Sequence, residues 1–395
     1  MMNSYINFKT NSKKLQFGVK KCKKMHVGKN QVDYKCQDLS VDKWSEVEVK
    51  NDVSGMVEMK DIFDGEHLME EKADEKYLGD VIATDGRNMK NIKSRIAKGT
   101  GIVNKILNML DGIQFGKHYF EVGVLLRESL LVSSILFNSE AWYNLTNAEL
   151  DLIETIDVSL LRSLLHAPKG TPKEMLYLEL GCIPFRDIIR ERRLNFLHYI
   201  LNEDEKSIVN RFFQAQLKNP TQKDWVTTVK NDLEYLDMKG SSMENIRKMK
   251  KVSFMKIIKE KNRGKVYEKL TKAKNSHSKV RKIEHSCIKI QKYLQPNSMK
   301  MTREEAQLIF RLICRVTETK NNLKGKYDNL ECGACGLVEE NQEHILECKE
   351  LKKKQSTEKI KYENLLNGTV EEKLKIAKQF KENFAILEKI KKGET

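Results

Sequence analysis

Three cysteines and one histidine lie within seventeen residues near the C-terminal end of the 395-residue chain, in the segment CGACGLVEENQEHILEC. Cys332 and Cys335 are separated by two residues, and Gly336 follows directly, so a tight turn can direct both thiolates toward one ion. His344 and Cys348 are four residues apart, which places them on one face of a helical turn. The spacing C-x2-C-x8-H-x3-C therefore predicts a single tetrahedral metal site.

Three thiolates and one imidazole fill all four positions of a tetrahedron. This donor set predicts a structural Zn²⁺ ion with no open catalytic position. The other five of the eight cysteines are scattered along the chain, which argues against a disulfide framework and for a reducing compartment. The alternative is an accidental cluster in a decayed sequence.

The net charge of +16 suits a polyanionic partner, which could be nucleic acid or an anionic membrane. No run approaches the ~18–20 apolar residues that a membrane span needs. The N-terminal residues contain no apolar segment typical of a signal peptide. We therefore expect a protein that spans no membrane, is not secreted and is nuclear, cytoplasmic or both.

Helical spacing of apolar residues dominates from Asn88 onward and predicts a mostly α fold. The N-terminal part lacks this spacing. A hairpin is expected at 15–36 and strands and loops at 37–75, so a small β or mixed N-terminal region should precede the helices. Expected helices include a buried one at 121–141, one at 147–166, and a pair at 170–201 interrupted by Gly181 and Pro184.

Two groups of basic residues could contact phosphate. Arg186, Arg190 and Arg193 recur at i, i+4 and i+7 on one face of the second helix of the 170–201 pair, where they form either a solvated face or a phosphate-binding one. Residues 241–300 contain 18 Lys and Arg against 4 Asp and Glu, a charge of +14. This stretch is either a phosphate-binding surface or a solvated lysine-rich one. Its candidate contacts are Lys248, Lys250, Lys251 and Lys256.

No catalytic constellation is visible in the sequence. A polymerase needs paired carboxylates that hold two Mg²⁺ ions, and the chain contains no Asp-Asp dipeptide. It also lacks a P-loop, a G-x-S-x-G motif and an H-E-x-x-H motif. We therefore expect that the chain is not an enzyme on its own.

Four segments in order along the chain together resemble the reverse transcriptases of non-LTR (LINE-type, jockey-like) retrotransposons. LQFGVKKCKKMHVGK is similar to the segment after the catalytic Asp-Asp strand, with Lys21-Cys22 matching a Lys-Thr or Lys-Cys pair there. KYLGDVIATDGRNMKNIKSRIAKG is similar to the primer grip, with Tyr77, Leu78 and Gly79, and to the start of the thumb. LYLELGCIPFRDIIRERRLNFLHYI is similar to the helical region after the thumb, and CGACGLVEENQEHILEC to the C-terminal CCHC finger.

The resemblance implies a division of the chain into five parts. They are a partial palm that ends in a primer-grip-like segment (1–80), a helical thumb-like domain (81–170), a basic helical connector (171–325), a CCHC zinc finger (326–350) and a charged C-terminal helix or tail (351–395). In the family, the catalytic aspartates precede the segment that begins at Leu15. The chain thus looks like a truncated RNA-directed DNA polymerase, inactive without the missing upstream polymerase portion.

The resemblance also implies that the thumb-like helices and the connector flank a template–primer duplex. Lys90, Lys93, Arg95 and Lys98 would then join the basic residues named above as phosphate contacts. Such contacts carry little sequence information, so RNA and DNA should both bind with weak sequence preference. The alternative function is a zinc-finger adaptor that binds a protein partner.

Overall fold

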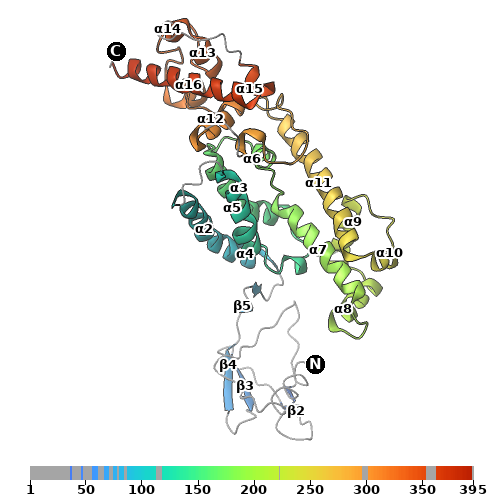
Figure 1. Ribbon diagram of the computed structural model, residues 1–395. Coiled ribbons are helices and arrows are strands. Elements are labelled where there is room, and N and C mark those ends of the chain that lie inside the picture. Colours follow the sequence, from blue (N-terminus) through green and yellow to red (C-terminus); the bar gives the residue numbers. More distant parts are fainter. Residues whose placement is uncertain are drawn as a thin grey trace. The chain divides into compact units, whose positions relative to one another are not determined.

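The computed structural model describes residues 80–83, 87–112, 118–221, 223–295, 301–352 and 362–393, and the backbone of short strands between residues 36 and 77. Figure 1 shows that helices make up most of this part of the chain, which confirms the predicted mostly α fold. The chain divides into two compact units, Met1–Arg95 and Ile96–Thr395.

The first unit contains antiparallel strand pairs that join neighbouring segments. They are β1 (Cys36–Gln37) with β2 (Glu46–Val47), β3 (Met56–Lys60) with β4 (Glu66–Glu70), and β5 (Asp74–Tyr77) with β6 (Asp80–Ala83). The hairpin expected at 15–36, including Lys21-Cys22, lies outside the described residues, as do Leu78 and Gly79. Tyr77 ends β5, where its backbone pairs with Asp80.

A buried polar cluster joins β6 to the helix that follows it. The Asn91 amide donates to Asp80 Oδ1 over 2.9 Å, and Arg95 forms an ion pair with the same carboxylate. The amide oxygen of Asn91 also accepts the Val81 N–H at 3.2 Å. Because β6 is short, these side-chain contacts fix its position relative to the first turns of α2 (Met89–Gly112).

Helices α2 and α5 follow the expected pattern, and the segment between them is helical with one irregular turn. The predicted helix at 121–141 runs without a break through α3 (Tyr119–Leu126), a π-helical turn η2 (Arg127–Val132) and α4 (Ser133–Ile135), and it ends before the 3-10 turn η3 (Ser139–Ala141). The predicted helix at 147–166 is α5 (Asn147–Leu165). Its first turn is closed by a capping box between Thr146 and Glu149.

The predicted helix pair at 170–201 is confirmed as α6 (Lys173–Leu180) and α7 (Phe185–Asn202). Gly181 ends α6 with a φ of +67°. A Cβ at this position would lie 2.5 Å from the Ile290 nitrogen, so only glycine allows the chain to pass here. The passing segment is hydrogen-bonded through Gln291 N–H to the Glu179 carbonyl at 2.9 Å.

The connector helices pack against α7 around their own apolar core. They are α8 (Ile208–Lys218), α9 (Trp225–Tyr235), α10 (Met243–Lys248) and α11 (Lys251–Asn275). Leu194 and Leu197 of α7 are fully buried in this core together with Val229, Phe254 and Ile258. The core explains why so basic a stretch folds: one face of α11 supplies apolar residues while most of its lysines stay outside, and the buried Lys274 donates to the Ile283 carbonyl.

The C-terminal elements form one packed module. They are α12 (Arg303–Ile313), the 3-10 turn η5 (Lys320–Lys326), α13 (Gln342–Glu347), α14 (Lys349–Lys352), α15 (Asn364–Asn367) and α16 (Val370–Lys391), with the short η4 turn (Lys292–Leu294) before them. Helix α16 packs against both α12 and α13. It buries Leu374, Ile376, Phe380 and Leu387. A helix is therefore present in the segment where a charged C-terminal helix or tail was expected, and it packs against the segment expected to form the finger.

A buried ion pair fixes the centre of the second unit. Arg127 and Asp157 are both 0% exposed, and the guanidinium donates to the two carboxylate oxygens at 2.6 and 2.7 Å. Arg127 also donates to the Ile183 carbonyl at 2.8 Å, and the Tyr177 hydroxyl donates to Asp157 at 3.1 Å. Burial alone would lower the pKa of Arg127, but Asp157 beside it raises that pKa well above the usual value.

Replacing Arg127 by Ala should lower the free energy of unfolding by about 3–5 kcal/mol, because the Asp157 carboxylate would remain buried without its partner. Urea denaturation followed by circular dichroism measures this loss. The double replacement Arg127→Met with Asp157→Leu should cost much less, because no charge stays buried. The exposed pair of Lys239 and Glu234 is the matched control, and Lys239→Ala should change stability by less than about 1 kcal/mol. Equal losses in Arg127→Ala and Lys239→Ala would contradict the prediction.

Candidate metal centre and basic surfaces

The structure brings the four expected ligands together. One ligand atom from each of Cys332, Cys335, His344 and Cys348 lies within 4.8 Å of the others. The Cys335 Sγ is 3.3 Å from the His344 Nε2. A metal ion at the centre of the cluster would form bonds of about 2.3 Å to sulfur and about 2.0 Å to nitrogen. Ligand atoms at these bond lengths have separations close to those in the structure. The four residues can therefore hold one metal ion.

The first two ligands lie on a tight hairpin. The Cys332 N–H donates to the Val338 carbonyl at 2.7 Å, and the Glu340 N–H donates to the Leu330 carbonyl at 2.7 Å. Between these bonds the Gly336 N–H returns to the Cys332 carbonyl at 2.8 Å, and Gly336 has a φ of +63°. The turn that the sequence predicts after Cys335 is thus present, and a glycine occupies its left-handed position.

The other two ligands lie on the predicted helical turn. Asn341 caps α13 by accepting the His344 N–H on its side chain at 2.8 Å. The Cys348 N–H donates to the His344 carbonyl at 2.6 Å, the i, i+4 bond that directs both side chains to one face. Capping at Asn341 fixes where the helix begins and therefore where the imidazole lies.

The pKa shifts of Cys335 and His344 suit metal ligands, whereas that of Cys332 opposes ionisation of its thiol. Burial raises the pKa of the Cys332 thiol to about 11. Burial also acts to raise the pKa of Cys335, but hydrogen bonds led by the Leu337 N–H outweigh it and lower that pKa. Burial lowers the pKa of His344, which keeps the imidazole neutral. A neutral imidazole and an easily ionised thiol are the forms that bind a metal ion.

Helix α16 braces the hairpin from outside the ligand segment. The buried Glu340 carboxylate accepts from Lys391 Nζ at 3.0 Å and from the Lys320 N–H at 3.2 Å. A Cβ at Gly333 would lie 3.5 Å from both the Leu387 and Lys391 side chains. The buried Asn383 amide donates to the Ile345 carbonyl at 2.8 Å. These contacts make the metal cluster part of a module with α16.

The arginine face expected on α7 is neither solvated nor open to phosphate. Arg193 forms an ion pair with Asp232 at 2.7 Å and is buried. Arg190 contacts the same carboxylate at 3.2 Å, and its guanidinium lies 3.8 Å from the centre of the Tyr235 ring. Arg186 forms an ion pair with Glu154 at 2.6 Å. These three arginines hold helices together, and the sequence pattern could not reveal their partners.

The thumb-like residues divide into two groups. Lys90, Lys93 and Lys98 are exposed on α2, which leaves them accessible to a polyanion. Arg95 is buried and bound to Asp80, so it belongs to the strand–helix contact described above.

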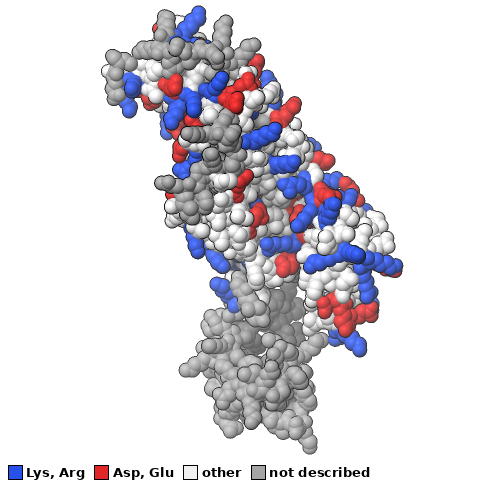
Figure 2. All heavy atoms as spheres, viewed as in Figure 1, with Lys and Arg blue, Asp and Glu red and all other residues white. Residues whose placement is uncertain are grey.

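The connector lysines are exposed, as a phosphate-binding surface requires. Lys248 forms an i, i+4 ion pair with Glu244 at 2.6 Å, and Lys256 lies 4.0 Å from Glu260. Lys250 and Lys251 are also exposed, at the N-cap and the first residue of α11. Figure 2 shows Lys and Arg side chains over this region of the face in view, with Asp and Glu interspersed. Surface ion pairs of this kind are weak and can be exchanged for phosphate contacts.

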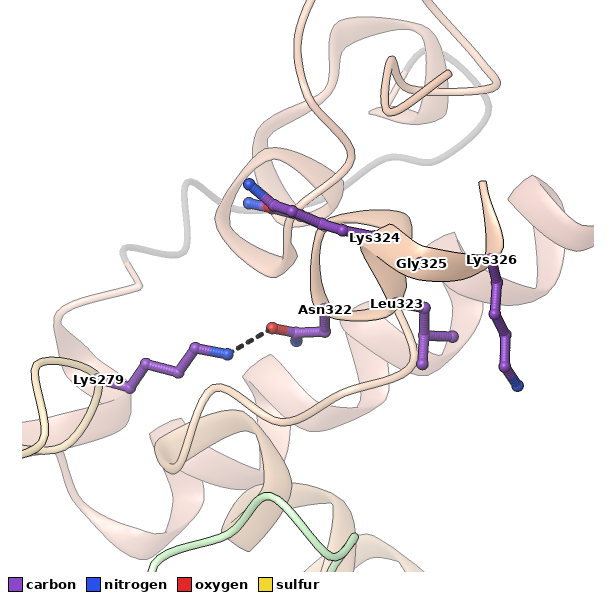
Figure 3. A pocket seen from close by; sticks show the side chains of 7 residues that line it. Lys279, Asn322, Leu323, Lys324, Gly325 and Lys326 are labelled. Atoms are coloured by element: carbon purple, nitrogen blue, oxygen red, sulfur yellow. Dashed lines mark hydrogen bonds between the residues drawn. The ribbon is translucent and has the colours of Figure 1, made fainter. Parts of the chain in front are cut away.

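A lysine-rich hollow was missed by the sequence analysis. Lys279, from the segment after α11, donates to the Asn322 side-chain oxygen at 2.9 Å, and Lys324 and Lys326 extend from η5 (Figure 3). Its other lining residues are Asn321, Leu323 and Gly325, so none of them carries a negative charge. The segment KNNLKGK, with three lysines in seven residues before the finger, was the available sequence indication.

Comparison with protein-family models, curated proteins and solved structures finds no match to this chain. No helix among the described residues is long and apolar enough to cross a membrane.

The purified chain should contain about one metal ion per molecule, bound by the four clustered side chains. Elemental analysis measures the amount and the element. Cys335→Ser should release the ion and increase hydrogen exchange in α13, while the helices α5 to α7 remain protected. Cys287→Ser is the matched control, because Cys287 is a partly exposed cysteine outside the cluster and its loss should leave the metal content unchanged. Metal-free protein, freshly purified without chelators, would contradict the assignment.

Proposed function

We propose that this chain binds RNA and DNA as the C-terminal part of a reverse transcriptase of the non-LTR retrotransposon kind. The observation that carries the proposal is the different use of two sets of cations. Arg186, Arg190 and Arg193 of α7 are bound to carboxylates, whereas four lysines at α10 and α11 are exposed: Lys248, Lys250, Lys251 and Lys256. An inner set that stabilises the fold and an outer set that contacts phosphates are what a nucleic-acid-binding helical connector needs.

Zn²⁺ is the metal we propose for the cluster. Three thiolates and an imidazole are the donors that zinc takes in closed structural sites. Structural zinc would stabilise the hairpin and α13, which contain few apolar residues of their own. The ion would then hold η5 and its lysines at a fixed place on the module, because the Lys320 N–H and Lys391 both bind Glu340.

A zinc adaptor that binds a protein is the second candidate. Leu337 and Val338 favour it, because both are exposed at the tip of the metal hairpin, at 83% and 50%. Nucleic acid remains the stronger candidate because the exposed cations extend over several elements. The two functions differ in their response to salt: phosphate binding weakens steeply, whereas a contact made by two apolar side chains does not.

The affinity for duplex should fall with salt at a log–log slope of about −4 to −5, if roughly five phosphates are neutralised. Fluorescence anisotropy at several salt concentrations measures the slope. The joint change of Lys248, Lys250, Lys251 and Lys256 to Glu should weaken binding to all sequences alike and flatten the slope. Unchanged affinity and slope would mean that this stretch is only a solvated surface.

A second reversal of equal charge separates a local contact from a general loss of positive charge. Its four positions are the exposed lysines of α16: Lys375, Lys378, Lys381 and Lys389. This control should reduce affinity less than the α10–α11 reversal. A third variant, with Lys279, Lys324 and Lys326 changed to Gln, tests the lysine-rich hollow. Its salt slope should be less steep by up to about 3.

We propose no catalytic role for the chain alone, because the sequence contains no Asp-Asp pair to hold the two metal ions of a polymerase. Incubation with a primed RNA template, nucleotides and Mg²⁺ or Mn²⁺ should give no extended primer. Template-dependent extension that persists through stringent purification would overturn this expectation.

A further inference from the structure

An open hollow at the ends of α5 and α12 contains two arginines that lack acidic partners. Its volume is about 410 Å³, within the ~300–1,000 Å³ range of small-molecule sites. Arg162 and Ser163 come from α5, Arg311 comes from α12, and His166 and Glu318 complete the polar lining. Neither arginine forms an ion pair with any described carboxylate. Arg127, Arg190 and Arg193 differ in this respect, since each binds an Asp side chain.

Arg311 is the less compensated of the two. Its Nε is buried and has no hydrogen-bond partner, although its residue is only partly buried overall. Burial lowers the pKa of Arg311, and the smaller opposing effect of Glu318 does not cancel it. Burial lowers the pKa of Arg162 as well. The fold thus places two partly desolvated positive charges at one hollow, where neither forms an ion pair and the nearby Glu318 offsets Arg311 only in part.

Helix capping does not account for these arginines. The last carbonyls of α5 are already bound by backbone, with Ala167 N–H to the Arg162 oxygen at 2.9 Å. At the end of α12, the Val316 N–H binds the Arg311 oxygen at 3.0 Å. The Arg162 side chain does have a structural role, since it donates to the Pro168 and Thr171 carbonyls at 2.7 and 3.0 Å. The Arg311 side chain has no such contact among the described residues.

We propose that this hollow binds a phosphate group, with Arg311 as its principal donor and Arg162 as the second cation. A guanidinium presents a planar fork of donors that matches phosphate oxygens. The Ser163 hydroxyl also lines the hollow, but it donates to the Ser159 carbonyl at 3.1 Å, so the two guanidinium groups are the donors for the phosphate. None of the hollow's residues belongs to the lysine surfaces proposed above to bind duplex, so this is a separate anion site.

Titration calorimetry with inorganic pyrophosphate tests the site in the full chain. One molecule should bind, and Arg311→Gln should weaken binding about tenfold or more, because a charged hydrogen-bonded pair is lost. Glu318→Gln should instead strengthen binding about fivefold, because it removes a nearby negative charge. A merely structural role of Glu318 would give no such gain. Circular dichroism should show unchanged folding of Arg311→Gln, since the side chain makes no described hydrogen bond.

Two further measurements identify the source of the phosphate group and distinguish this site from the surfaces that bind nucleic acid. An oligonucleotide with a 5′-phosphate should compete with pyrophosphate if the site holds a strand end, and the same strand without that phosphate should not. Competition by neither strand assigns the site to a free phosphate compound. The Lys279, Lys324 and Lys326 variant should bind pyrophosphate normally. The proposal fails if pyrophosphate does not bind, or if it binds equally well to the native chain, Arg311→Gln and Glu318→Gln.

Discussion

The buried pair of Arg127 and Asp157 is the contact on which the arrangement of the second unit depends. A charge without water or a partner would be very costly at 0% exposure, so the guanidinium must meet its carboxylate and the Ile183 carbonyl together. That requirement brings η2, α5 and the turn before α7 to one point, and Tyr177 of α6 completes it. Apolar packing alone would tolerate several orientations of these helices, whereas one bidentate pair specifies one.

Local chemistry made much of the fold predictable. The boundary between α6 and α7 followed from Gly181 and Pro184, residues that act on their own sequence neighbours. The capping box of Thr146 and Glu149 that opens α5 was not part of that prediction, although it too is local. The π-helical turn within the 121–141 segment was not predictable in this way. It begins at Arg127, whose partner lies thirty residues further along the chain. Hydrophobic periodicity carries no information about such a distant partner, so it predicted a regular helix.

The candidate metal site shows the same division. All four ligands were predictable because their spacing is local, and Gly336 and Asn341 shape the hairpin and helix that present them. The support from Leu387 and Lys391 was not, because it comes from a C-terminal helix whose packing partner the sequence pattern does not specify. The α7 arginines were assigned to a surface for a related reason. A regular spacing of charges is the same on a solvated face and on one that meets Asp232.

The crossing at Gly181 has a consequence for how the chain can change in length. Gly181 lies against the backbone of residues 289 and 290, and the Gln291 N–H is hydrogen-bonded to the Glu179 carbonyl. The segment that leads into α7 and the segment that follows α11 therefore meet at this point. Tyr293 strengthens this junction by donating to Glu179 at 2.6 Å. Once such a loop is closed, each doubling of its length costs only about 0.6 kcal/mol of chain entropy. Related chains could therefore lengthen or shorten the basic segment from α7 to α11, while the place where the chain continues toward α12 stays unchanged.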